Sequence, residues 1–170
     1  MKRLLVFSAL VLLTACSLAQ ASPTSVPPSP TTFPSMTDIT VYFTYLPNFN
    51  VGTEPYEKAV TRQVPMTDNL PKVVLDQLFQ GPTADEKAQG LAVFTNGATG
   101  ISKLSVEDGV ARVYLAGDCN SNGAAYTISN LIDVNLKQFP EIKWIKIYDP
   151  SGQTETPDGQ SGSIPFCLEP

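Results

Sequence analysis

The sequence contains no histidine, which removes the side chain that most often serves as an acid–base catalyst or a metal ligand near neutral pH. It also has no G-x-S-x-G or S-x-x-K motif and no glycine-rich phosphate loop. Its carboxylates are scattered over turns and helix starts, where capping and solubility explain them. We therefore predict no catalytic residue, no cofactor and no enzymatic activity. A glycosidase-like carboxylate pair is the alternative that a sequence leaves open, because such a pair forms in space.

Basic residues are also scarce. The chain has 11 lysines and arginines against 16 aspartates and glutamates, a net charge of −5. Removal of Lys2 and Arg3 with the signal described below leaves 9 basic residues and a net charge of −7. The sequence shows no local cluster of lysine and arginine. An acidic chain without such a cluster is not attracted to a phosphate backbone, so we exclude nucleic acid as a partner.

No apolar run is long enough to span a bilayer as a helix. The longest covers residues 4–13, follows the basic start Met1-Lys2-Arg3, and ends at Leu13-Thr14-Ala15-Cys16. A short basic-then-apolar start is typical of a secretion signal. Small residues that lead directly into a cysteine resemble the bacterial lipobox. This resemblance implies a lipoprotein signal over residues 1–16, acylation of Cys16, and a lipid anchor on the extracytoplasmic side of the cell membrane.

Ala19-Gln20-Ala21 is an alternative, small-x-small cleavage site. Cleavage there would release a soluble secreted protein that begins at Ser22. Both interpretations place the chain outside the cytoplasm, and they differ only in the tether.

Residues 17–37 are rich in proline, serine and threonine. Such a composition cannot bury enough apolar surface to form a core, so we predict a disordered linker. Residues 38–170 have a globular pattern and are numerous enough for a single domain with one core.

Besides Cys16, the chain contains Cys119 and Cys167. An even number of cysteines in an oxidising compartment predicts a structural disulfide, here closing a loop of roughly 50 residues. Residues 118–123 match the first half of an EF-hand calcium loop, but the twelfth position is Ser129 instead of glutamate. We therefore predict a turn before the last helix and no metal site.

Apolar periodicity predicts a series of strands and helices. The expected strands cover residues 39–46, 58–64, 101–106, 110–115 and 142–148. A first helix starts between residues 67 and 71 and ends at Gly81-Pro82, a short helical turn follows a Thr83/Glu86 capping box, and a last helix covers 124–139. Glu107-Asp108-Gly109 predicts a hairpin turn. The order β-β-α-β-β-α-β implies an α+β two-layer sandwich, with helices packed on one face of a mostly antiparallel sheet.

Trp144 lies on the last predicted strand, with Tyr148 on the same face and isoleucines on the other. Two apolar faces indicate either a strand covered on both sides or an exposed face that binds a partner. Core packing is the default interpretation. Trp144, Tyr148 and Tyr42 form our candidate interaction surface.

Three segments resemble the GerMN domain of sporulation and spore-germination lipoproteins. They are Leu75–Thr83 with the Gly81-Pro82-Thr83 unit, Leu104–Leu115, and Gln138–Lys143. The resemblance covers about residues 39–152. It implies a compact α/β domain, similar to the ring-building modules of membrane-spanning assemblies, with no established catalysis. That family often carries two such domains, and this chain has room for one.

These observations predict a membrane-anchored, extracytoplasmic lipoprotein. Its GerMN-like domain would mediate protein–protein interaction or assembly at the cell envelope, with an envelope protein or a second copy as partner. The lipid bilayer would be contacted through acylated Cys16. The alternative is a surface lipoprotein that binds a small molecule or a glycan in a pocket lined by Tyr42, Tyr45, Tyr114, Tyr126 or Trp144.

Overall fold

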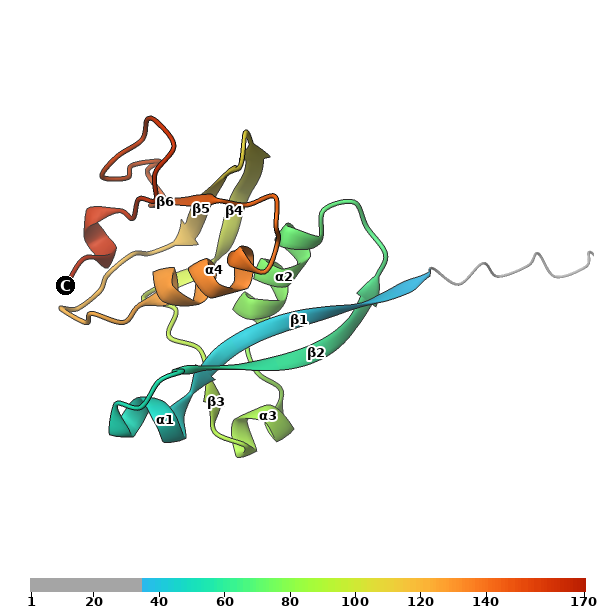
Figure 1. Cartoon of the computed structure of the whole chain (residues 1–170). Helices are drawn as coiled ribbons and strands as arrows, with labels where there is room; N and C mark the ends of the chain where they lie inside the picture. The colour runs from blue at the N-terminus through green and yellow to red at the C-terminus, as the bar shows by residue number, and fades with distance from the viewer. Residues whose placement is uncertain (1–34) are drawn as a thin grey trace, which may run out of the picture. The chain divides into compact units, whose positions relative to one another are not determined.

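A three-stranded antiparallel sheet forms the first part of the fold. The computed structural model describes residues 35–170 (Figure 1). Strand β1 (Met36–Tyr45) is central and lies between β2 (Glu57–Pro65) and the short β3 (Leu91–Ala92). Strand β1 begins two residues before the predicted start of the domain. A short helix, α1 (Leu46–Val51), fills the connection between β1 and β2 that we expected to be a loop.

A second three-stranded sheet consists of β4 (Ala98–Glu107), β5 (Val110–Gly117) and β6 (Trp144–Tyr148). The pair β4–β5 is antiparallel, whereas β5–β6 is parallel. Asp108 and Gly109 connect β4 to β5 and both have positive φ angles, of 52° and 78°. This backbone matches the predicted two-residue hairpin turn, because such turns place their central residues in the left-handed region.

Two helices, α2 (Leu70–Gln80) and α4 (Ile128–Lys137), pack between the two sheets (Figure 1). Helix α2 contacts β1 and β4, and α4 contacts β1 and β6. Both helices turn an apolar face into the shared core, to which Leu75, Leu78, Leu131, Ile132 and Leu136 contribute fully buried side chains. The α+β class is confirmed, and the longer elements follow the predicted order β-β-α-β-β-α-β, to which the structure adds the short α1 and β3.

The strands are divided between two sheets because α4 occupies the edge of β1 where a further strand would pair. The Asn135 Oδ1 atom accepts a hydrogen bond from the Tyr42 N–H at 2.9 Å. Its Nδ2 group donates to the Tyr42 and Leu131 carbonyls at 2.9 and 2.8 Å. The Gln138 amide donates to the Thr40 carbonyl at 3.1 Å. Helix side chains thus satisfy backbone groups that an additional strand would otherwise bind.

Helix α4 starts at Ile128, four residues later than expected. Thr127 is its N-cap: the Thr127 hydroxyl accepts from the Ser129 N–H, and the Asn130 Oδ1 atom accepts from the Thr127 N–H at 2.9 Å. The predicted capping box of Thr83 and Glu86 is present at the start of α3 (Ala84–Ala88). Capping side chains, and not apolar periodicity alone, determine where these helices begin.

The C-terminal tail returns to the second sheet and is tied there. A disulfide joins Cys119 and Cys167, the two cysteines that the sequence pairs. Ser163 forms a parallel bridge with β6, since the Ile147 N–H donates to the Ser163 carbonyl at 2.8 Å and the Ser163 N–H donates to the Ile145 carbonyl at 3.0 Å. A short 3-10 helix, η1 (Phe166–Leu168), follows.

The predicted signal, with its lipidation site Cys16 and nearly all of the predicted linker, lies outside the described residues. Within residues 35–170, no helix has the length and apolar character needed to cross a bilayer. In the same range, histidine, cysteine and acidic side chains form no group of three that could hold a metal ion.

Candidate functional site

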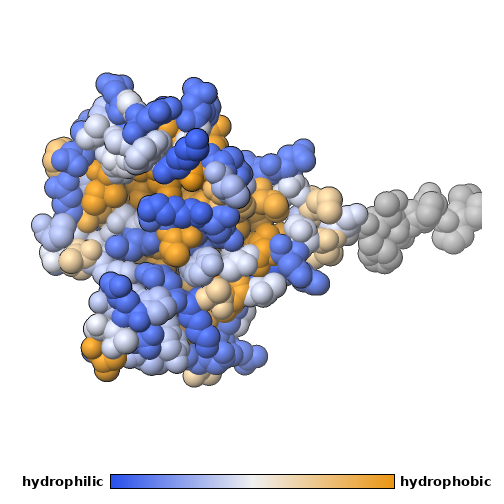
Figure 2. All heavy atoms as spheres, viewed as in Figure 1, coloured by the Kyte–Doolittle hydropathy of each residue, from blue (hydrophilic) through white to orange (hydrophobic). Residues whose placement is uncertain are grey.

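Two adjoining hollows lie along α4, with cavity volumes of about 560 and 860 Å³. Glu57 and Asn130 line both, so the hollows form one continuous depression, which we call the α4 groove. One part lies against β6 and the C-terminal tail, and the other against the connection between α1 and β2. Figure 2, viewed from the same side as Figure 1, shows apolar residues at the surface on either side of polar ones in the region of α4.

The floor of the α4 groove is apolar where it meets the second sheet. It consists of Val134 from α4, Ile145 and Ile147 from β6, and Ile164 from the tail. The isoleucines of β6 are nearly buried. Most of the apolar area that a partner could still cover therefore comes from Val134 and Ile164, which are half-buried.

The opposite end of the groove is aromatic. The Phe49 and Tyr126 rings lie 5.1 Å apart between centroids, and Tyr56 meets both rings edge-on, at 5.8 and 6.1 Å. Such edge-to-face contacts stabilise a cluster beyond the area that it buries. The cluster connects α1 and the start of β2 to the segment before α4, and so fixes the width of the groove at this end.

Tyr126 holds Glu57 at the junction of the two hollows. The Tyr126 hydroxyl donates to the Glu57 carboxylate at 2.6 Å and accepts a longer bond, 3.4 Å, from Thr44. Burial, and then the hydrogen bond to Glu57, raise the pKa of Tyr126 well above its usual value. Tyr126 is therefore a neutral donor that positions the carboxylate, and it is no candidate for a general base.

The α4 groove is acidic. Four carboxylates line it, from Glu54, Glu57, Asp133 and Glu155. Among the described residues that line the two hollows, none is lysine or arginine. Asp133 also pairs with Lys137 one turn further along α4, at 2.7 Å, but both side chains are largely exposed and such a pair is weak. The groove therefore presents a negative potential to solvent.

The structure places the three predicted surface aromatics in different environments. Trp144 is 42% exposed at the start of β6, as an interaction surface requires. Tyr148 is only 6% exposed, because it stacks on Tyr114 with ring centroids 4.4 Å apart. Tyr148 is therefore not a surface residue. Tyr42 is half-buried on β1, in the other sheet. Of the aromatics proposed for a small-molecule pocket, Tyr126 alone lines the α4 groove.

Lys146 was missed by sequence reasoning. It is completely buried between Trp144 and Tyr148 on the outer face of β6. Its ammonium donates to the carbonyls of Thr156 and Asp158 and to the Ser161 hydroxyl. Alternation along the strand predicts a solvated lysine on that face. Instead, the lysine holds the tail loop against the sheet, and this loop supplies Glu155 to the groove.

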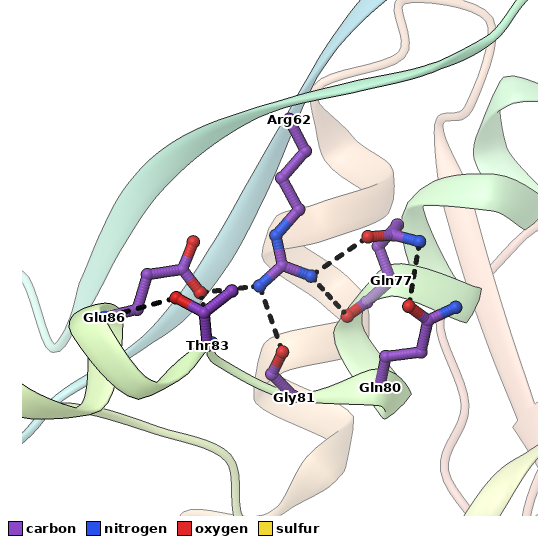
Figure 3. Close-up of polar contacts among 6 residues, drawn as sticks. All are labelled: Arg62, Gln77, Gln80, Gly81, Thr83 and Glu86. Carbon is purple, nitrogen blue, oxygen red and sulfur yellow. Dashed lines mark hydrogen bonds and ion pairs between the residues drawn. The ribbon is translucent and has the colours of Figure 1, made fainter.

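A second polar cluster surrounds Arg62 of β2 (Figure 3). Its guanidinium donates to the carbonyl and the side-chain oxygen of Gln77 at 3.2 and 3.0 Å. It also donates to the Gly81 carbonyl at 3.0 Å and forms an ion pair of 2.6 Å with Glu86. One side chain thus joins β2 to the end of α2 and the start of α3, the segment that carries the Gly-Pro-Thr unit.

Glu86 completes this cluster by accepting from both Arg62 and the Thr83 N–H, at 2.6 and 2.7 Å. Burial alone would raise the pKa of Glu86, but hydrogen bonds from Arg62 and Thr83 outweigh it and keep the pKa below its usual value. Both the arginine and the carboxylate are occupied by the fold. The cluster therefore joins β2, α2 and α3, and Nε of Arg62, the guanidinium nitrogen without a hydrogen-bond partner among the described residues, is buried.

Comparison with known proteins identifies the family of this chain. The model of the Germane family, described as sporulation and spore germination, matches residues 40–148, and the chain belongs to that family. The match contains the Arg62 cluster and α4, but it ends before the tail that forms one wall of the α4 groove. The family is a sporulation and germination domain and is not a known enzyme family.

Among solved structures, the chain is similar to the tandem GerMN domains of the sporulation protein GerM from Bacillus subtilis. The sequence identity is 17% and the TM-score 0.47, with 87% of this chain and 50% of that chain covered. The chain thus spans about half the length of that structure. No curated protein sequence matches the chain significantly.

Proposed function

We propose that this protein is a lipid-anchored, extracytoplasmic lipoprotein whose non-catalytic GerMN-type domain binds another protein at the cell envelope. The α4 groove is the observation that carries this proposal. It is open to solvent, extends along a helix and two sheets, and combines an apolar floor with acidic walls. Those properties suit a protein segment better than an enclosed small molecule.

The export signal and the linker support the location. A signal that ends in a lipobox cysteine would tether the chain at Cys16. The proline-rich linker of residues 17–37 would then hold the domain up to roughly 60 Å from the lipid, at the rise of an extended proline-rich chain. A binding domain at that distance can reach partners that are themselves anchored in the envelope.

The tether is tested by fractionation of the host that makes the protein. We expect the wild-type chain in the membrane fraction, with intact mass showing an acylated Cys16 at the mature N-terminus. Cys16→Ser should move it out of that fraction. A wild-type chain that is released and begins at Ser22 would contradict the lipid anchor.

The interaction is tested by site-specific photo-crosslinking in the same host. A photoreactive residue at Asn130, which lies where the two hollows meet, should give a discrete adduct with one envelope protein. The control position is Ala88, an exposed residue of α3 that lines neither hollow. Equal crosslinking at both positions, or none at Asn130, would count against the groove as a protein-binding site.

A further inference from the structure

We infer that the α4 groove binds an extended partner segment that carries a basic side chain between apolar ones. This inference rests on the proposed function and adds the chemistry of the partner. One hollow of the groove is lined both by apolar side chains, with Val134 and Ile164, and by the carboxylates of Asp133 and Glu155. A lysine or arginine fits such a surface, because its aliphatic stem packs on apolar side chains while its charged head reaches the carboxylates.

The walls of this groove are fixed before any partner binds. The Glu155 N–H donates to the Ile164 carbonyl at 3.1 Å, and the Thr156 N–H donates to the Ser163 hydroxyl at 2.8 Å. On the other side, Tyr126 holds the Glu57 carboxylate. The backbone that carries Glu155 and the carboxylate of Glu57 are thus already ordered, so less conformational entropy is lost when a cation binds there.

Charge distinguishes the partner segment from the other candidate occupants. The chain's own linker, residues 17–37, contains no lysine or arginine and does not complement the groove. A second copy of the chain is itself acidic, with a net charge of −7 after removal of the signal. Anionic lipid head groups would be repelled. A basic segment of a different protein is the occupant that the electrostatics favour.

The preference for a basic segment depends on the C-terminal tail, which lies outside the part of the chain that matches the family. The family match ends at residue 148, whereas Glu155, Ser163 and Ile164 lie beyond it. Lys146 and the Cys119–Cys167 disulfide hold that segment in place. Other members of the family that lack such a tail would not have this wall, and we expect them to lack the same preference.

The inference is tested with the full-length protein in detergent and three capped peptides of equal length. The first alternates leucine and arginine, the second leucine and serine, and the third leucine and glutamate. We expect fluorescence anisotropy to show saturable binding of the first peptide alone. The affinity should fall as salt is raised, because exposed charges are screened. Equal binding of the serine peptide would overturn the role of charge.

A pair of matched variants separates the groove from the general acidity of the protein. Asp133→Asn with Glu155→Gln should weaken binding of the arginine peptide on the order of tenfold. Asp85→Asn with Glu141→Gln removes the same charge from exposed positions outside the groove, and should change the affinity less than twofold. Equal weakening by the two pairs would overturn the inference.

The variant Asp133→Asn with Glu155→Gln could weaken binding by changing the conformation of the tail instead of the charge. A charge-reversal variant distinguishes these two causes. Asp133→Arg with Glu155→Arg should lose the arginine peptide and gain the glutamate peptide, and loss of both would overturn the assignment. The alternative occupant of the groove is a second copy of the chain, and sedimentation velocity tests it. If Asp133→Asn with Glu155→Gln made the protein dimerise, the occupant would be a second copy and the inference would be wrong. An Asn130 crosslink without arginine-peptide binding would refute this inference while leaving the proposed function intact.

Discussion

At the residue scale, Asn135 is the buried polar side chain of α4. It lies on the apolar face of the helix and is completely buried. Its amide oxygen accepts a hydrogen bond from the Tyr42 N–H, and its amide nitrogen donates to the carbonyls of Tyr42 and Leu131. A buried amide is tolerated in a core only when its hydrogen bonds are made. Asn135 therefore links α4 to β1 and ends the first sheet there.

Replacement of Asn135 by leucine should destabilise the domain although it makes the helix face more apolar. The backbone N–H and carbonyl of Tyr42 would lose their partners, and each unpaired buried group costs about 1–3 kcal/mol. We expect the free energy of unfolding to fall by about 3 kcal/mol in urea titrations. Asn50→Ala, at an exposed position of α1, is the control and should be nearly neutral. An unchanged urea midpoint for Asn135→Leu would show that water or another group forms hydrogen bonds with the Tyr42 backbone in its place.

At the scale of elements, the Arg62 cluster determines how β2, α2 and α3 meet. A single guanidinium reaches Gln77 at the end of α2, Gly81 in the connection, and Glu86 in α3. It also lies over the Phe43 ring, with the guanidinium carbon 5.0 Å from the centroid. The planar fork of arginine makes these contacts at the same time, which a lysine could not do.

The lowered pKa of Glu86 makes this junction sensitive to acid. A carboxyl whose pKa is lower in the folded state contributes stability above its unfolded pKa, and that contribution is lost as the pH falls through the folded value. We therefore expect wild type to be more stable than Glu86→Gln at pH 7, with the difference shrinking below about pH 4.5. Urea titrations between pH 7 and 3 measure it. Asp85→Asn, an exposed neighbour on α3, is the control, and a pH-independent gap for Glu86→Gln would refute the linkage.

At the scale of the whole molecule, the disulfide connects the end of the chain to the segment after β5. Cys119 and Cys167 are 48 residues apart in the sequence. A cross-link over that length removes conformations from the unfolded chain and stabilises the fold by roughly 4 kcal/mol in the chain-entropy model. The same bond fixes the tail whose preceding residues form one wall of the α4 groove.

Removal of the disulfide should therefore lower the free energy of unfolding while leaving most of the folded structure unchanged. For Cys119→Ala with Cys167→Ala we expect the free energy of unfolding to fall by about 3–4 kcal/mol. Reduction of the wild-type protein should lower its free energy of unfolding by a similar amount. Lys146 and the Ser163 bridge should keep the loop over β6 in place, so hydrogen exchange should rise mainly after Ile164. If the double variant matched oxidised wild type in urea, the bond would be dispensable to the fold.

The sequence by itself determined the local features, since each depends on residues that are neighbours in the chain. The Asp108–Gly109 turn follows from backbone preferences. The Thr83/Glu86 box follows from capping, and the alternation of strands and helices from apolar periodicity. The prediction that Cys119 pairs with Cys167 needed only the number of cysteines and the expectation that the chain is exported.

Only the tertiary structure decided what becomes buried and which distant residues meet. Burial of Lys146 and Tyr148 depends on a tail loop that returns across β6, and the division into two sheets depends on Asn135 reaching β1. The α4 groove joins residues 54–57, 130–134 and 155–164, which no spacing in the sequence relates. Contacts of this kind arise when folded elements pack against each other, so a linear pattern of residues does not contain them.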